Sequence, residues 1–229
     1  MRTSWYDRML TFNATFFYTW YDDFQSQQFD GNSFLVTNAG SLISYGVETD
    51  ALFAPHPMFF AGLATGYNHA RYDDFANSPC SSERAFEERV IAGNLATPTA
   101  CTEDLSGRPL DNAPEWTVST FAQFTAPIGD MPWLEWPLLG FLRAEYSYRD
   151  RVYLAQDLDE NLLQPPMNLV NLRGGLRTED DHWELTLWAM NLFDESYNVV
   201  GVDVPIVSGY VGINGPPRTY GATLRYRFY

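Results

Sequence analysis

The arginine side chains are the residues whose type and spacing suggest a chemical role for this chain. All 14 basic residues are Arg and none is Lys. Half of them recur at odd-numbered positions in three short segments, a spacing that puts the members of each segment on one face of a β-strand. Rows of guanidinium groups would attract an anionic solute or an acidic domain, or would pair with Glu48, Asp50, Glu145 and Glu184. The candidate arginines are Arg143, Arg149, Arg151, Arg173, Arg177, Arg225 and Arg227.

Signals for catalysis are weak. His56, His69 and His182 are scattered and lack the spacing of metal ligands. The sequence contains no Gly-x-Ser-x-Gly, His-Glu-x-x-His or phosphate-binding loop. We therefore predict that the chain is not an enzyme and needs no cofactor. We expect the loop acids Asp157, Asp159 and Glu160 to face water or cations bound to lipopolysaccharide.

The two cysteines, Cys80 and Cys101, lie in one polar segment. In an oxidising compartment they could close a loop of about 22 residues, a constraint worth roughly 3 kcal/mol in chain entropy. The alternative is a pair of free thiols.

Charge and hydropathy narrow the class of protein. The formal charge of −15 argues against a nucleic-acid partner. No apolar run reaches the length of a transmembrane helix. The mean hydropathy of −0.26 is typical of soluble proteins, but in a β-barrel the polar residues of the lumen dilute the lipid-facing ones. Residues 1–5 show no apolar region of a signal peptide, so an outer-membrane location requires the chain to be a fragment.

The last ten residues show the elements that position the arginines. Even-numbered residues there are apolar or aromatic, whereas Arg225 and Arg227 fall on the opposite face. Similar alternation recurs along the chain, although residues 58–73 do not allow their faces to be assigned. Strands of a soluble β-sandwich are usually about 5–6 residues long, and these are longer. The predicted strands cover 10–23, 41–53, 58–73, 116–126, 141–153, 168–178, 182–191 and 220–229.

The connections alternate in length. Long segments follow the odd-numbered predicted strands, at 24–40, 74–115, 154–167 and 192–218, and two of the others are short, at 54–57 and 179–181. Outer-membrane barrels have long extracellular loops and short periplasmic turns. The sequence therefore predicts an all-β fold, namely a portion of an antiparallel transmembrane β-barrel with about eight long strands. Aromatic residues would form girdles at its two interfaces: Trp20, Trp116 and Tyr148 outside, and Trp183, Tyr226 and Phe228 inside.

Three motifs resemble those of a known family. Residues 104–116 read DLSGRPLDNAPEW, residues 191–197 read NLFDESY, and residues 217–221 read PRTYG. In this order they resemble segments of TonB-dependent outer-membrane receptors. The five residues at the end of the chain that match the barrel-assembly signal of such proteins are Tyr220, Leu224, Tyr226, Phe228 and Tyr229, although family barrels usually end in Phe.

The resemblance implies a role and partners. Such receptors are barrels of the 22-stranded kind, plugged by an N-terminal domain, and import scarce solutes such as ferric siderophores, cobalamin or carbohydrates. Residues 1–229 match the C-terminal portion of the barrel, without plug or signal peptide. The implied location is the bacterial cell outer membrane. The implied partners are its lipid, the missing plug and barrel strands, the TonB complex acting through the plug, and the barrel-assembly machinery; the solute is not identified.

Two alternatives remain open at this stage. One is a self-contained eight-stranded outer-membrane barrel of structural or adhesion type, since eight strands can close with side chains filling the interior. The other is a membrane-embedded hydrolase of the outer-membrane phospholipase type. Such an enzyme needs a Ser–His pair on one face, and the sequence shows no evident serine partner for His182.

Overall fold

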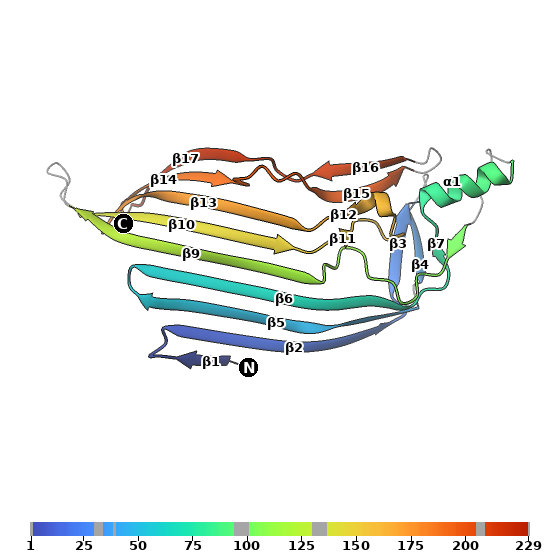
Figure 1. Ribbon diagram of the computed structural model, residues 1–229, viewed down its shortest axis with the longest axis horizontal. Helices are drawn as coiled ribbons and strands as arrows, with labels where there is room; N and C mark the ends of the chain where they lie inside the picture. Colours follow the sequence, from blue (N-terminus) through green and yellow to red (C-terminus); the bar gives the residue numbers. More distant parts are fainter. Residues whose placement is uncertain are drawn as a thin grey trace.

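The chain folds into one large, open antiparallel sheet (Figure 1). The computed structural model describes residues 2–29, 34–38, 40–93, 101–129, 137–204 and 209–228. Nine strands follow one another across the sheet in chain order, and each pairs with the next. They are β1 (Arg2–Trp5), β2 (Leu10–Asp22), β5 (Ser41–His56), β6 (Phe59–Asp74), β9 (Trp116–Gly129), β10 (Leu138–Arg149), β13 (Met167–Thr178), β14 (Trp183–Met190) and β17 (Thr219–Tyr226).

The eight predicted strands are all present, and the sequence analysis missed one. Strand β1 has four residues, too few to show an alternating pattern. Most boundaries also differ from the prediction, by one to four residues. The fifth predicted strand ends at Arg149 instead of residue 153, so Arg151 lies in the loop that follows it, and the last strand ends at Tyr226.

The two ends of the sheet differ. At the turn end, on the left in Figure 1, the described connections are the short ones at 6–9, 57–58 and 179–182. At the loop end, the connections fold into small elements that the sequence did not reveal (Figure 1). These are the hairpins β3–β4 (Gln25–Phe29, Phe34–Asn38), β7–β8 (Ser78–Pro79, Thr102–Glu103), β11–β12 (Val152–Tyr153, Leu163–Gln164) and β15–β16 (Asn198–Val204, Gly209–Asn214), the helix α1 (Ser82–Ile91) and the 3-10 turn η1 (Glu160–Leu162).

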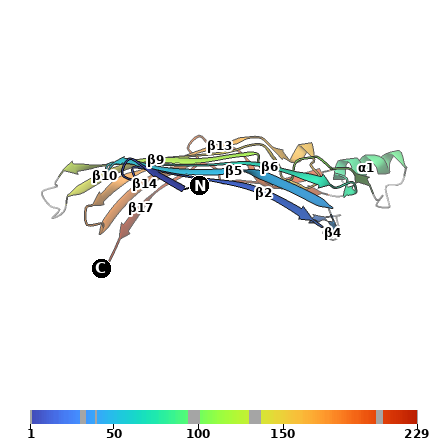
Figure 2. The ribbon, with the colours of Figure 1, turned by 90° about the horizontal axis from the view of Figure 1, so that it is seen from below.

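The sheet is curved and open. Figure 2 shows that it is bowed, and its first and last strands, β1 and β17, are edges that do not pair with each other in the described part of the chain. Among the described residues, no helix has both the length and the apolar character needed to span a membrane.

One face of the sheet, which we call the outer face, is apolar and exposed. Paired residues point to the same side of a sheet, and the register pairs Leu142 with Phe124 and Leu185 with Leu224. Phe16 is 80% exposed, Leu187 61% and Leu224 67%. An apolar surface of this extent is not stable against water in a monomeric soluble protein, whereas lipid would cover it.

The register also assigns the faces of β6, which the sequence left open. Strand β5 pairs Ala51 with Leu63 and Val47 with Tyr67, so the odd-numbered residues of β6 lie on the outer face. The hydroxyl groups there are satisfied: Thr49 and Thr65 share a hydrogen bond of 2.7 Å. That arrangement suits a hydrocarbon environment, where unpaired polar groups are costly.

Candidate functional site: the inner face and the loop end

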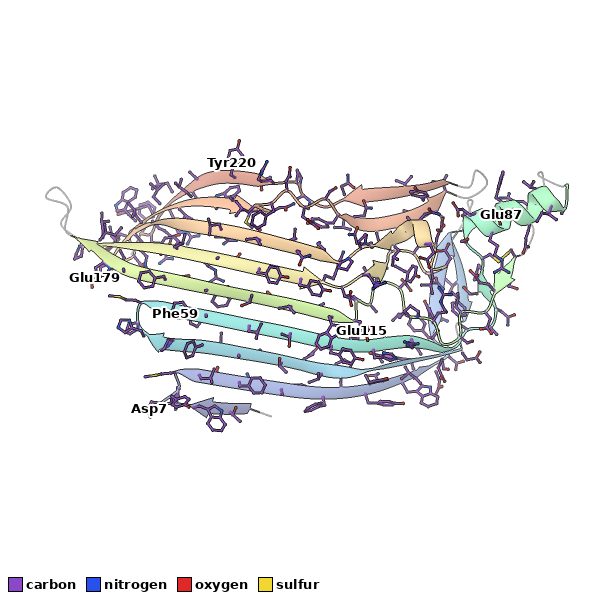
Figure 3. The ribbon with its side chains drawn as sticks, viewed as in Figure 1. Asp7, Phe59, Glu87, Glu115, Glu179 and Tyr220 are labelled. Carbon is purple, nitrogen blue, oxygen red and sulfur yellow. A yellow bond between two sulfur atoms is a disulfide. The ribbon has the colours of Figure 1, made fainter. Side chains whose placement is uncertain are left out.

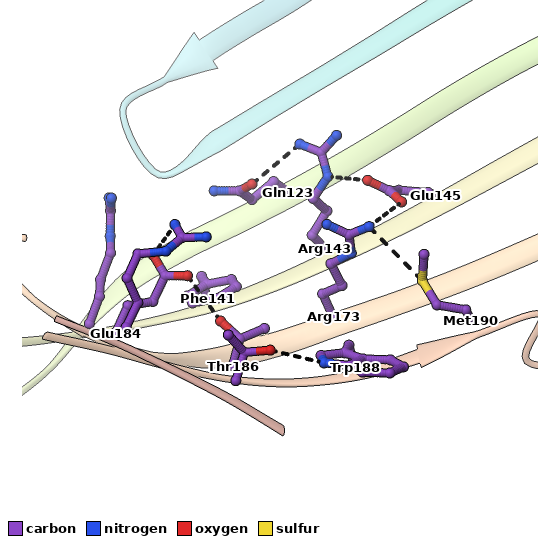
Figure 4. Close-up of a pocket in the computed structure, with 12 residues that line it drawn as sticks. Gln123, Phe141, Arg143, Glu145, Arg173, Glu184, Thr186, Trp188 and Met190 are labelled. Atoms are coloured by element: carbon purple, nitrogen blue, oxygen red, sulfur yellow. Dashed lines mark hydrogen bonds and ion pairs between the residues drawn. The ribbon is translucent and has the colours of Figure 1, made fainter. Parts of the chain in front are cut away.

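The opposite, inner face of the sheet carries a cavity of about 550 Å³ over β9, β10, β13, β14 and β17 (Figure 4). Four arginines and two glutamates supply its charged lining, so the cavity is cationic. Phe141 and Trp188 supply aromatic surface. The charged residues are Arg143, Arg173, Arg177, Arg225, Glu145 and Glu184.

Glu145 joins two of these arginines (Figure 4). The Nε of Arg143 donates to Glu145 Oε1 at 2.7 Å, and Arg173 Nη2 lies 3.7 Å from Glu145 Oε2. The guanidinium of Arg143 also lies 4.0 Å from the ring centre of Phe121, a cation–π contact. Because both partners of Glu145 are held by the sheet, this side of the cavity is preorganised.

The turn-end side of the cavity has its own ion pairs. Arg225 Nη1 lies 3.8 Å from Glu184 Oε2. Asp181, in the turn after β13, pairs with two further arginines. Its Oδ1 lies 3.1 Å from Arg177 Nη1, and its Oδ2 lies 3.6 Å from Arg227 Nη1. The arginines thus pair with Glu145 and Glu184 as one of the sequence alternatives proposed, and Asp181 is a partner that the sequence did not suggest.

The other two acids proposed as partners lie on different strands. Glu48 and Asp50 belong to β5, and Asp50 accepts a hydrogen bond of 2.6 Å from Asn13 Nδ2. No ion pair between either acid and the seven arginines occurs in the described residues.

Arg149 and Arg151 lie apart from the cavity, toward the loop end. Arg149 ends β10, and its Nε and Nη2 atoms are shielded from solvent and have no hydrogen-bond partner among the described residues. Arg151 is exposed in the loop. Of the seven candidates, the structure therefore brings five together between the middle of the sheet and the turn end, and leaves two at the loop end.

The motif at 104–116 folds its loop onto the strands. Leu105 packs with Tyr72, Phe75 and Leu158 in the buried apolar cluster of the loop end. The hydroxyl of Tyr72 donates to Asp111 Oδ1 at 2.9 Å. A second loop is attached as well, since the backbone N of residue 112 donates to the carbonyl of residue 153 at 2.9 Å. The motif is therefore structural here: it fixes two loops against β6.

The motif at 191–197 closes the base of the last loop. Asn191 is 6% exposed, and its Nδ2 donates to the carbonyls of Glu195, at 2.8 Å, and Pro216, at 3.2 Å. Its Oδ1 accepts from Glu195 N at 2.8 Å. Asp194 Oδ1 accepts from the backbone N of Arg218 at 2.9 Å, which joins the two ends of the loop where β17 begins.

The cysteines and the chain end are placed as follows. Cys80 and Cys101 form a disulfide with Cα atoms 5.5 Å apart, in the loop that carries α1.

In β17, Tyr220, Leu224 and Tyr226 lie on the outer face, and Figure 3 shows Tyr220 at the edge of the sheet. The ring of Phe228 lies 4.5 Å from that of Tyr226, whereas Tyr229 lies outside the described residues.

Aromatic rings gather at both ends of the outer face. Trp183 and Tyr226 lie 4.5 Å apart, centre to centre, at the turn end. Tyr67 and Trp116 lie 4.9 Å apart toward the loop end. Figure 3 helps to locate the two ends, since Glu179 marks the turn end and Glu115 lies beside Trp116 in the chain. Two such girdles bound the apolar band of a transmembrane barrel.

The histidines do not build a reactive centre. The Nδ1 of His182 lies 2.6 Å from Asp180 Oδ2 in a turn. The Nδ1 of His69 lies 3.8 Å from Glu115. Throughout the described ranges, no three His, Cys, Asp or Glu side chains are arranged to hold a metal ion.

One expectation about the loops was wrong in part. Asp157 and Asp159 do not face water, because each is only 6% exposed, whereas Glu160 is exposed. The reason is that the loop between β10 and β13 packs under the β15–β16 hairpin, with Leu154 and Leu162 against Gly201. Only contacts between distant segments create this burial, so a local sequence pattern could not show it.

Comparison with known proteins identifies the architecture. A family model described as "TonB dependent receptor-like, beta-barrel" matches residues 1–192. No curated protein matches the sequence. Among solved structures, the ferric yersiniabactin uptake receptor FyuA from Yersinia pestis superposes with a TM-score of 0.68 and 17% identity over 100% of this chain and 29% of its own. The siderophore receptor PiuA from Acinetobacter baumannii superposes with a TM-score of 0.65 and 15% identity, over 97% of this chain and 26% of its own.

The ferric-catecholate import receptor Fiu from E. coli K12 is also similar, with a TM-score of 0.61 and 16% identity over 97% of this chain and 26% of its own. At these identities the likeness shows the fold alone, and this chain spans less than a third of the length of each of these proteins. The family is one of transport receptors of the bacterial outer membrane, not of enzymes. The chain belongs to the TonB-dependent receptor β-barrel family.

Proposed function

We propose that residues 1–229 form the C-terminal portion of the barrel of an outer-membrane receptor that imports a ferric siderophore with energy from TonB. The observation that carries this proposal is the two-sided sheet, apolar and exposed outside and cationic inside. The structural neighbours named as siderophore or ferric-complex receptors support the substrate class.

The inner face is suited to hold another domain. Its cavity is open to the interior, and its arginines exceed its glutamates in number. In a complete receptor the plug would lie against this face, and its carboxylates would find charged donors already positioned by Glu145 and Glu184. The cavity extends from the middle of the sheet toward the turn end, which is the periplasmic side in this proposal.

The solute would bind nearer the loop end, which is then extracellular. Arg149 offers guanidinium atoms without a partner among the described residues, and Arg151 is exposed beside it. Ferric siderophores often carry negative charge, and a guanidinium binds carboxylate or phenolate oxygens by charge-assisted hydrogen bonds.

The test is uptake by cells that produce the complete receptor as their only siderophore receptor. We expect iron-55 delivered by a siderophore to enter wild-type cells and not cells that lack TonB. We expect the Arg149→Ala variant to lose affinity for the solute while it still inserts and shows heat-modifiable mobility. Recovery of the protein as a water-soluble monomer would refute the membrane assignment, and uptake independent of TonB would refute the transport mechanism.

The self-contained eight-stranded barrel is less well supported. Such a barrel must pair its first and last strands, and here β1 and β17 are separate edges of a curved sheet in the described part of the chain. An open edge of backbone donors and acceptors inside a membrane needs further strands to pair with.

A further inference from the structure

Two loops meet at the loop end through a tight contact. The hairpin β15–β16 presents Gly201 to Leu154 and Leu162, and a Cβ atom at this glycine would lie only 3.0 Å from Leu154 Cβ. The hairpin is also tied by Asn198 N, which donates to Gln164 Oε1 at 2.7 Å. Segments about 40 residues apart in the sequence thus form one interface.

This interface contains three acids. Asp157 and Asp159 are each 6% exposed, and Asp203 of β15 interacts with both. Asp159 Oδ1 accepts two hydrogen bonds from Asn161, at 2.8 and 3.0 Å. Asp159 Oδ2 and Asp203 Oδ1 are shielded from solvent and have no donor among the described residues. An ionised carboxylate can only accept hydrogen bonds, so at least one of the three groups must bring its own proton to bond with the others.

We propose that Asp157, Asp159 and Asp203 form a proton-operated latch, in which one shared carboxyl proton holds the β15–β16 hairpin closed on the loop between β10 and β13. The loops face the medium if the proposed function is right. Loss of the proton leaves three like charges at the interface, two of them buried, and the interface then separates. The latch therefore links the conformation of the receptor mouth to external pH.

The surroundings agree with one proton bound at neutral pH. Burial, followed by the neighbouring Asp157 and Asp159, raises the pKa of Asp203 to about 9. The other charged group of η1, Glu160, is engaged by the hydroxyl of Tyr153 at 2.7 Å. Tyr210, which faces Asp203 in the hairpin register, is 54% exposed.

The sign of the pH effect follows. The closed state binds one proton more than the open state between the ordinary pKa of an aspartate, about 4, and about 9. The equilibrium constant for closing should therefore fall as pH rises through this range, by up to about tenfold per unit. Above it, the constant should no longer change.

The experiment measures the distance between the two loops in the complete receptor in outer-membrane vesicles. Spin labels at Arg151→Cys and Val211→Cys, both exposed positions, report the distance by pulsed electron resonance from pH 6 to 10.5. We expect a short distance at pH 6, and a population of longer distances that grows up to about pH 9 and then stays constant to pH 10.5. The Asp203→Asn variant should stay closed throughout, because its amide supplies a donor at every pH. The control Glu160→Gln should behave like wild type.

Each outcome decides the proposal. A wild-type distance that is the same at pH 6 and pH 10.5 overturns the proposal. Opening of the loops at pH 7 when EDTA is added also overturns it, because that result would show that a divalent cation, and not a proton, holds them together. If Asp203→Asn does not insert, Asp159→Asn is the substitute with the same expected result. Failure of the latch would leave TonB-dependent uptake intact, whereas failure of the proposed function would appear as loss of membrane insertion.

Discussion

Replacing Leu187 by arginine should destabilise the protein because this position lies near the middle of the membrane. Leu187 is four residues from Trp183, whose ring belongs to the turn-end girdle. At about 3.4 Å per residue and a strand tilt of about 40°, its depth is roughly 10 Å inside an apolar band of about 25 Å. An arginine near the midplane costs about 2–4 kcal/mol, so we expect the free energy of unfolding of Leu187→Arg to fall by about this amount.

The assay is equilibrium unfolding by guanidinium in lipid vesicles, followed by tryptophan fluorescence. Leu187→Ala removes the same side chain without adding charge, so the difference between the two variants isolates the cost of the guanidinium in lipid. Ser119→Arg places the same group on the inner face, since Ser119 pairs with Ser147 there, and should change stability by less than about 1 kcal/mol. If Leu187→Arg is no less stable than Leu187→Ala, the outer face is not in lipid and the reasoning fails.

Three further predictions concern the inner face and the loops. Glu145→Gln removes the carboxylate shared by two arginines and should lower the free energy of unfolding by about 1–2 kcal/mol; an unchanged denaturation midpoint would contradict the role given to this residue. Asn191→Ala deletes three buried hydrogen bonds and should cost about 2–3 kcal/mol, seen as faster proteolysis of the last loop. Reduction of the disulfide between Cys80 and Cys101 should destabilise its loop by up to about 3 kcal/mol and leave barrel insertion unchanged. Limited proteolysis reports the loop stability, and heat-modifiable mobility reports the insertion.

The strands were predictable because their signal is local. Alternation over ten or more residues identified seven of the eight long strands, the exception being 58–73, where the pattern is blurred. The family model and the structure confirm the antiparallel barrel portion. The faces of β6 were not predictable because Gly62 and Gly66 leave gaps in the row of side chains on its inner face. Gly62 makes room for Phe121, since a Cβ atom there would collide with that ring. The reason for these glycines becomes visible only when β9 is beside β6.

The site was less predictable because it depends on register and on loop packing. The alternation placed the arginines on one face, but their partners depend on which residues lie opposite in adjacent strands, and a single sequence does not specify register. Asp181 and the buried acids of the latch were missed for this reason. The motifs at 104–116 and 191–197 identified the family correctly, although the structure shows that their residues serve loop closure.

The central claim is that the two faces of the sheet lie in different media. Spin labels at Leu172 and Leu224 on the outer face, and at Arg173 and Arg225 on the inner face, test it in the complete receptor in membranes. Collisions with oxygen, which dissolves in lipid, and with a water-soluble nickel chelate report the surroundings of each label. The account predicts high oxygen and low nickel accessibility at the two leucines, and less oxygen contact with more nickel contact at the two arginines. Nickel access at the leucines equal to that at the arginines would contradict it.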